Sequence, residues 1–221
     1  LDLNAYIDAI IRSLEELGPN AHVIAICQPC VPLTAALSYM KSIDHPCYPL
    51  SVTMKGGPVD TRYNPTGANE MPQRLAAQHG IEGALHRIER DLIMNVSPWH
   101  EGGGQPVHHR YNQLAGFHAL DIQSHVNSYA ENWARVAFGG DQSKIDRHNR
   151  FRIGYNHVRN LPGQYLLDTN RAAFLDAAIA NRRLEYRPNG GHEVHLVEPS
   201  NITDLDIFVV EGATDTITGR G

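Results

Sequence analysis

The chain has 221 residues, of which 42% are hydrophobic and 19% charged, a composition typical of a globular protein with a complete core. Its formal net charge is −5, so no basic field attracts nucleic acid or anionic lipid, and we expect neither as a partner. Three cysteines form an odd and small set, which argues against a disulfide framework and for a reducing, cytoplasmic compartment.

Residues 1–18 predict an amphipathic helix. Apolar side chains recur there at helical spacing, opposite a face of Asp, Arg and Glu. The apolar positions are Leu3, Ile7, Ile10, Ile11, Leu14 and Leu17. The segment has no basic leader, and no stretch of the chain reaches the roughly 18 to 20 apolar residues that span a bilayer, so we expect no membrane partner.

The next elements alternate between strand and helix. AHVIAI (21–26) predicts a short strand of the kind buried in parallel sheets. Residues 29–40 predict a helix with Pro29 and Pro32 in its first turn, where a missing amide is tolerated. SVTMKGG (51–57) predicts a second strand, and the order helix, strand, helix, strand is typical of an α/β fold.

After Pro58 the pattern becomes mainly helical. Residues 71–96 predict a helix, WHEGGGQPVHH (99–109) a long irregular loop, and 112–187 an interrupted helical region without strands. A short apolar strand returns at DLDIFVVEG (204–212).

We therefore predict an α/β protein with mainly parallel strands, interrupted by a large helical insertion. The predicted core comprises residues 1–70 and 196–221, and the insertion comprises residues 71–195. This insertion is expected to lie over the carboxyl ends of the strands.

Cys27 stands where the first strand turns into the helix that follows. A residue at such a turn points out at the carboxyl edge of the sheet, where open α/β folds bind ligands. The helix N-terminus supplies amides and a dipole that lower a thiol's pKa and stabilise an oxyanion. α/β-Hydrolases usually read G-x-S-x-G at this turn; here Ala25 is the first small residue and Pro29 replaces the second glycine. Cys27 is a candidate nucleophile, and the alternative is a buried core cysteine.

Four stretches of the chain, taken together, carry a family resemblance. They are LNAYIDAIIRSLEELGPNAHVIAICQPCVPLTAALSYM, SVTMKGGPVDTRYNPTGANE, YNHVRNLPGQYLLDTNRAAFLDAAI and FVVEGATDTITGRG. Their words CQP-x-VP and GGP-x-DTR are more specific than a lone hydrolase turn. In order and over essentially the whole chain, they resemble the intracellular polyhydroxyalkanoate (polyhydroxybutyrate, PHB) depolymerases.

The resemblance implies a partial α/β-hydrolase fold with the insertion as a lid, and a Cys, Asp, His triad. Such a protein hydrolyses ester bonds of stored polyhydroxyalkanoate through an acyl-enzyme, in the cytoplasm or at granules, without metal or organic cofactor. Carried over by position, Cys27 is the nucleophile and Asp215 the acid after the last strand. The Gln28 backbone N–H is the implied oxyanion donor. The family usually shows two acidic residues in that loop, whereas here Thr216 follows Asp215.

The implied histidine is not found at its expected place. In this fold it follows the acid, and residues 216–221 contain no histidine. The strands that precede the nucleophile strand in this fold are also missing from the sequence. We therefore expect a segment of a longer depolymerase-like protein, or a shortened relative. A replacement histidine from the insertion is disfavoured by the fold order.

The 13 histidines do not form a recognisable metal motif. His108, His109, His118 and His125 lie near one another in the chain, and His192 and His195 flank a glutamate. Their spacing does not match HExxH. His118 and His125, seven residues apart, are compatible with one helical face, but no third ligand is indicated, so no metal is predicted.

Several further residues are assigned structural roles. Cys30 is expected to be packed and Cys47 inert, and Asp60 is expected to pair with Arg62 rather than serve the site. Six aromatic residues are expected mostly to pack in a core, the alternative being a channel for an apolar polyester. These are Trp99, Tyr111, Phe117, Tyr129, Trp133 and Phe138.

Two alternative functions stay open. A polyhydroxyalkanoate synthase-like acyltransferase also uses a cysteine on this fold, although CQP and GGPVDTR resemble the depolymerases. A non-catalytic protein of the granule surface is the second alternative, favoured by the missing histidine. In either case the polymer or its granule surface is the expected partner.

Overall fold

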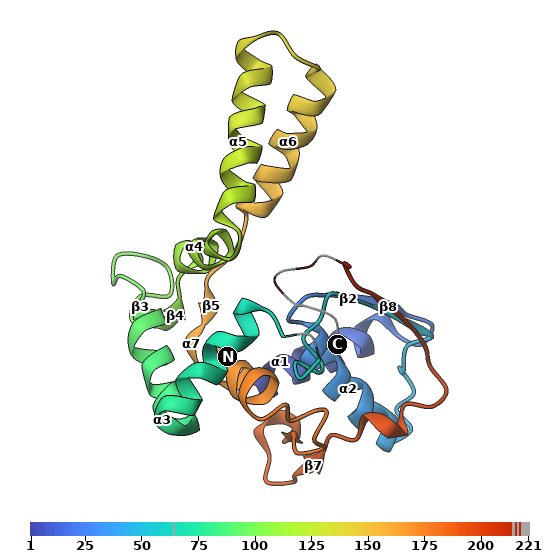
Figure 1. Ribbon diagram of the computed structural model, residues 1–221. Coiled ribbons are helices and arrows are strands. Elements are labelled where there is room, and N and C mark those ends of the chain that lie inside the picture. The colour runs from blue at the N-terminus through green and yellow to red at the C-terminus, as the bar shows by residue number, and fades with distance from the viewer. Residues whose placement is uncertain (64, 214, 216, 218–221) are drawn as a thin grey trace. The chain divides into compact units, whose positions relative to one another are not determined.

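A computed structural model describes residues 1–63, 65–213, 215 and 217 of the chain (Figure 1). Two compact units make up the fold: Leu1–Asp91 together with Pro162–Gly221, and Leu92–Leu161. The mixture of helices with a small parallel sheet agrees with the predicted α/β class. The predicted core and insertion boundaries stay a prediction.

A three-stranded parallel sheet organises the first unit. Its strands are β1 (His22–Ile26), β2 (Ser51–Lys55) and β8 (Asp206–Val210), in the order β1-β2-β8. All three strands were predicted from their apolar runs, and both pairings are parallel. Because parallel strands end at the same edge, the loops after Ile26, Lys55 and Val210 meet there.

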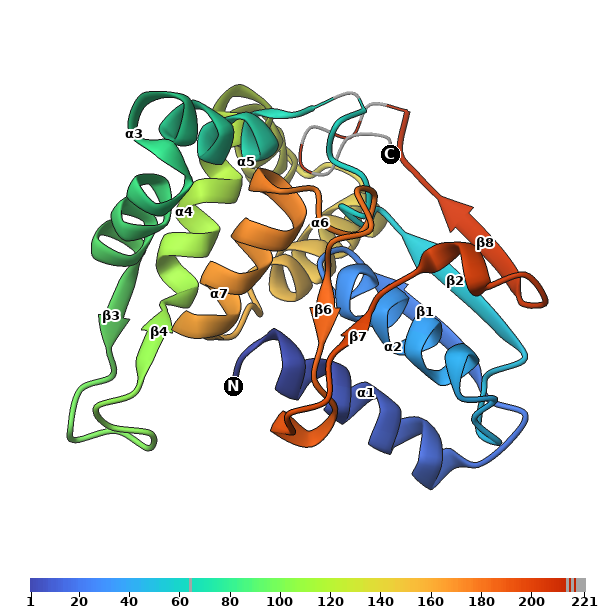
Figure 2. The same ribbon diagram turned by 90° about the horizontal axis from the view of Figure 1, so that it is seen from below.

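Two helices pack together beside this sheet. α1 (Leu3–Leu17) begins at Asp2, whose carboxylate accepts a hydrogen bond of 2.7 Å from the Ala5 N–H, and it buries the predicted apolar stripe. α2 (Cys30–Ser42) begins at Pro29, as predicted, and is buried on most of its faces. Figure 2 shows α2 in front of the sheet with α1 beside it.

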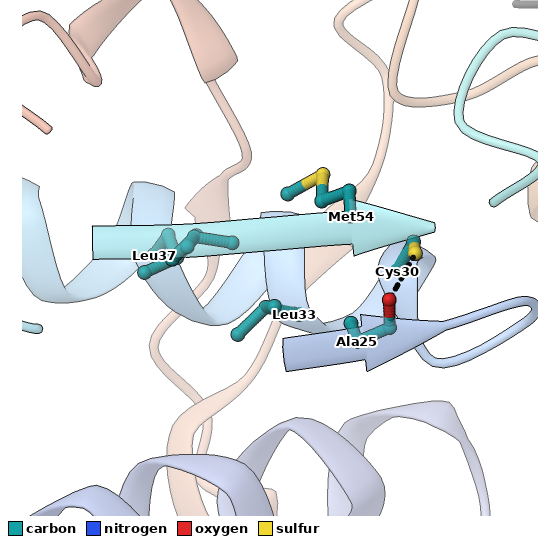
Figure 3. Close-up of a cluster of buried hydrophobic side chains, with 6 residues drawn as sticks. Ala25, Cys30, Leu33, Leu37 and Met54 are labelled. Atoms are coloured by element: carbon teal, nitrogen blue, oxygen red, sulfur yellow. Dashed lines mark hydrogen bonds between the residues drawn. The ribbon is translucent and has the colours of Figure 1, made fainter. Parts of the chain in front are cut away.

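The core of the first unit lies between α2 and one face of the sheet (Figure 3). Its buried members come from both layers: Ala25, Cys30, Leu33, Leu37, Val52 and Met54. Strand side chains alternate between faces, so Ile24 and Ile26 point away from this core. Ile24 is 70% exposed, and Phe208 of β8, which like Ile24 is a register partner of Thr53 on β2, is 61% exposed. Among the residues that the structure describes, nothing covers this second face of the sheet, which is apolar.

Gly57 permits α2 to approach the end of β2. A Cβ at this position would overlap the Cβ and Sγ atoms of Cys30. Cys30 itself is fully buried, and its thiol donates to the Ala25 carbonyl (Figure 3). The close approach of helix and strand thus requires glycine at position 57, the second glycine of the GGP-x-DTR motif.

The remaining elements of the first unit flank these layers. α3 (Gly67–Leu92) is bent at Gly80, where φ is +73°. α7 (Gly163–Thr169) runs into a π-helical turn, Asn170–Leu175. β6 (Glu185–Tyr186) pairs antiparallel with β7 (His195–Leu196). The predicted absence of strands over 112–187 is wrong at Leu161–Pro162 and at Glu185–Tyr186, because a two-residue strand is too short to show periodicity.

The Tyr186 hydroxyl links the β6–β7 strand pair to α1 by a hydrogen bond. It donates to the buried Asp8 carboxylate over 2.5 Å, and the Asn189 N–H donates to the same oxygen over 3.0 Å. Two donors satisfy a carboxylate that would otherwise be costly to bury.

The second unit begins with a small antiparallel hairpin. β3 (Ile93–Asn95) pairs with β4 (Pro106–His108), and β5 (Leu161–Pro162) completes that sheet. The sequence predicted helix to residue 96 and an irregular loop over 99–109, which is wrong at these two three-residue strands. Three helices follow: α4 (Arg110–Leu120), α5 (Ile122–Ala137) and α6 (Gln142–Tyr155). No helix in the described residues is long and apolar enough to cross a bilayer.

α5 contacts α6 but buries none of its residues. Arg152 of α6 lies over the Tyr129 ring at 4.3 Å, and the remaining apolar face of α5 is exposed. The predicted core packing is wrong for five of the six aromatic residues, of which Trp99 is 92% and Phe138 88% exposed; the other three are Tyr111, Tyr129 and Trp133. A helical period shows that residues share a face, but it does not show what covers that face.

We expect Gly57→Ala to lower the free energy of unfolding by about 1–3 kcal/mol, because the added methyl group must displace Cys30 or β2. Gly116→Ala is the matched control: Gly116 lies within α4 with open space around it, so alanine should be neutral or stabilise by up to about 1 kcal/mol. Denaturant unfolding followed by far-ultraviolet circular dichroism measures both. Equal effects of the two substitutions would contradict the packing argument.

Candidate active site at the carboxyl edge of the sheet

Cys27 occupies a sharp turn between β1 and α2. Its N–H donates to the Lys55 carbonyl over 2.8 Å, and its carbonyl accepts from the Cys30 N–H over 3.0 Å. Between these bonds the Cys27 φ is +66°, in the left-handed region that residues with a Cβ avoid at about 1–2 kcal/mol. The side chain is half-buried. Such a strained strand-to-helix turn is where hydrolases of the predicted fold present their nucleophile.

The Cys27 thiol is held in its neutral form. Burial raises its pKa above the ordinary value; the Gln28 N–H, hydrogen-bonded to the thiol, opposes this shift, and the Asp215 carboxylate adds to it. The sequence argument expected a helix N-terminus to lower this pKa. That expectation is wrong in sign because burial outweighs the amide. A nucleophile of this kind requires a base to take its proton.

Asp215 lies at the same edge as Cys27. It follows β8, and its charge is among the three influences that set the Cys27 pKa. The Asp215 Oδ1 accepts a 2.7 Å hydrogen bond from the Ile217 N–H, and the Asp215 N–H donates to the Gly212 carbonyl over 3.2 Å. These bonds fix the loop around the carboxylate. Thr216, at the position of the family's second acidic residue, lies outside the described residues.

The Gln28 amide lies beside the sulfur atom. As the first amide after Cys27 it donates toward Sγ, while the Gln28 carbonyl accepts from the Val31 N–H over 3.1 Å in the first helical turn. An oxyanion formed on an acyl group attached to Sγ would lie near this amide. Its role as oxyanion donor stays a prediction.

Tyr165 of α7 is a neighbour of Cys27 that the sequence argument did not identify. It is 4% exposed, and its hydroxyl lies next to the side chain of Thr169. Burial raises the pKa of this phenol, and the charges of Tyr6 and Cys27 raise it further. Tyr6 packs edge-on against its ring, with centroids 5.1 Å apart. A tyrosine in an apolar stretch predicts only core packing, so no sequence signal distinguished this residue.

The histidines do not complete this site within the part of the chain that is described. No histidine nitrogen there is hydrogen-bonded to the Cys27 sulfur. His118 and His125 have rings 4.4 Å apart, but they belong to α4 and α5 rather than to one helical face. The His125 Nδ1 lies 2.9 Å from Arg152 Nη1, and burial, His118 and Arg152 lower the His125 pKa.

The other predicted residues have structural surroundings. Asp60 forms a two-point ion pair with Arg62, at 2.7 and 2.8 Å, which confirms the structural interpretation. Cys30 is packed, as predicted, and Cys47 is a free, half-buried thiol. No group of three or more His, Cys, Asp or Glu residues in the described ranges is arranged to hold a metal ion.

Comparison with known proteins decides the family. A family model described as "PHB de-polymerase C-terminus" matches residues 56–221. The chain belongs to the PHB depolymerase family. The match contains Asp215 and the whole GGP-x-DTR word, which starts at Gly56, and it begins beyond Cys27. A search among curated proteins gave no match.

The strain at Cys27 predicts an unusual order of stability. Cys27→Gly should be more stable than Cys27→Ala by roughly 1 kcal/mol, because glycine adopts a φ of +66° without the clash that any Cβ brings. At an ordinary position alanine would be the more stable. Denaturant unfolding of the two variants, side by side, measures the difference, and a more stable alanine variant would contradict the strain.

The electrostatic contact between Asp215 and Cys27 predicts that the Cys27 thiol reacts faster when the Asp215 charge is removed. Asp215→Asn removes a negative charge that raises the Cys27 pKa, so more thiolate forms at a given pH. Alkylation of Cys27 by iodoacetamide at pH 8 should become about two- to fivefold faster. The rate is measured by mass spectrometry of the Cys27 peptide. Asp204→Asn is the control, since Asp204 pairs with Lys41 at 2.7 Å and does not influence the thiol; equal rates in both variants would refute the contact.

Proposed function

We propose that the chain is a depolymerase segment that hydrolyses ester bonds of polyhydroxybutyrate, with Cys27 as the nucleophile. One observation carries the proposal: Cys27 has a left-handed backbone at the end of a parallel strand, in electrostatic contact with Asp215. Family membership supports the substrate class. In this proposal the parallel sheet belongs to an α/β-hydrolase core, and residues 71–195 form its lid.

The chemistry proceeds in two stages. A base takes the Cys27 proton, the sulfur forms a bond to the ester carbonyl carbon, and the oxyanion is stabilised by the Gln28 N–H. The carbon–oxygen ester bond then breaks, and the departing alkoxide takes the proton. Water hydrolyses the thioester to a carboxylic acid and restores the thiol.

Asp215 is assigned to orient the base, which in the family resemblance is a histidine. The raised pKa of Cys27 supports a separate base, because a neutral thiol must lose its proton before or during attack, whereas a preformed thiolate needs no base. The buried Tyr165 and the half-buried Tyr6 form an aromatic pair near the thiol, and we assign them to the wall that receives the apolar acyl chain.

We expect an activated ester such as p-nitrophenyl butyrate to leave a butyryl group on Cys27, because a thioester intermediate is part of the mechanism. Intact-mass and peptide mass spectrometry detect this adduct after acid quenching. Cys27→Ala should lose the adduct and lower release of hydroxybutyrate from amorphous granules at least about 10³-fold.

Cys47→Ala is the matched control, since Cys47 is also a free, half-buried thiol but lies away from the strand end. The Cys47→Ala variant should still form the butyryl adduct on Cys27 and release hydroxybutyrate at the unmodified rate. Adducts spread evenly over the three cysteines, or none on any of them, would rule out Cys27 as the nucleophile.

A non-catalytic protein of the granule surface is the second candidate. The exposed apolar face of α5, formed by Ile122, Val126, Trp133 and Val136, favours it. Under this alternative, Cys27→Ala protein sediments with amorphous granules as well as the unmodified chain does, and neither releases hydroxybutyrate. Release that depends on Cys27 distinguishes the depolymerase.

A further inference from the structure

The second unit contains a cavity of about 890 Å³ that the proposed reaction does not use. It lies among the β3–β4 hairpin, the first residues of α4 and the segment 157–160. Figure 1 labels β3, β4 and α4. Every lining residue belongs to Leu92–Leu161. Its volume is in the range of about 300–1,000 Å³ that is typical of small-molecule sites.

The lining carries an excess of cationic groups. Arg110 and Arg159 contribute guanidinium groups, against one carboxylate, from Glu101. Arg110 Nη2 donates to the Tyr111 hydroxyl over 2.9 Å and its guanidinium lies 4.8 Å from that ring's centroid, so its contacts leave the charge unneutralised. Arg159 makes no ion pair or hydrogen bond within the described part of the chain. Two guanidinium groups at one cavity favour an anionic ligand.

Four hydrophobic residues also line the cavity, beside polar side chains that include His100, His109 and His157. Met94, Val96, Val107 and Val158 contribute hydrocarbon surface next to the guanidinium groups. An inorganic anion would leave this surface unused, and a neutral ester would leave the guanidinium groups unused. The ligand that fits both is a short, mainly apolar chain that ends in a carboxylate.

We propose that this cavity binds the carboxylate end of a linear hydroxyalkanoate oligomer. The inference rests on the proposed function, because every ester bond hydrolysed leaves one new carboxylate on an oligomer or chain end. Arg159 and Arg110 receive the carboxylate, and the valine and methionine side chains contact the first hydroxyacyl unit. The cavity is thus a product or chain-end site, separate in its residues from the Cys27 edge.

Isothermal titration calorimetry on the full chain tests the proposal. Cys27→Ala serves as the starting protein, so that no ligand is consumed. The linear trimer of 3-hydroxybutyrate, with a free carboxylate, should bind at least about tenfold more tightly than its methyl ester, which has the same apolar body without the charge. Adding Arg159→Gln should reduce the affinity for the acid to that for the ester.

Arg150→Gln is the matched control, because Arg150 is an exposed arginine of α6 outside the cavity lining. It should leave the tenfold preference unchanged. Three results would overturn the proposal. They are equal affinity for the acid and the ester, an equal loss of affinity for the acid in both arginine variants, and phosphate binding as tight as that of the trimer. Acylation of Cys27 is measured separately, so failure of the cavity and failure of the nucleophile give different results.

Discussion

The candidate site depends on a single strained backbone position. Cys27 has a left-handed φ because two hydrogen bonds fix its peptide groups, one to β2 and one within the first turn of α2. Both partners are held by the close approach of α2 to β2, which Gly57 permits. Folding of the core therefore supplies the strain energy and aims the sulfur outward. The same packing that buries Cys30 exposes part of Cys27, three residues away.

Burial and charge then decide how the thiol reacts. A helix N-terminus favours the thiolate, but the half-buried surroundings and Asp215 together favour the thiol. The site therefore suits proton transfer coupled to attack, and a negative charge at Asp215 does more for an imidazolium than for a thiolate. In the proposed mechanism Asp215 therefore serves the base, although its charge makes the Cys27 thiol less acidic.

Sequence reasoning succeeded where periodicity and fold order were strong. The helix over Leu3–Leu17, the three parallel strands and the convergence of Cys27 with Asp215 were predictable, because apolar runs and parallel connections constrain them. It failed where tertiary surroundings decide. The strand Ile93–Asn95 is too short for a pattern, Tyr165 has an ordinary apolar context, and the direction of the Cys27 pKa shift depends on burial that no local window contains.

The uncovered face of the parallel sheet has a consequence for the behaviour of the chain in solution. Ile24 and Phe208 lie on this apolar face, and within the described part of the chain β1 and β8 are the two edge strands of the sheet. Parallel sheets are normally enclosed on both faces, so this face favours the adsorption of hydrophobic dyes, while the edge strands beside it are templates for strand addition. Concentrated preparations will therefore self-associate through the sheet, and a polypeptide that covers it will keep the chain monodisperse.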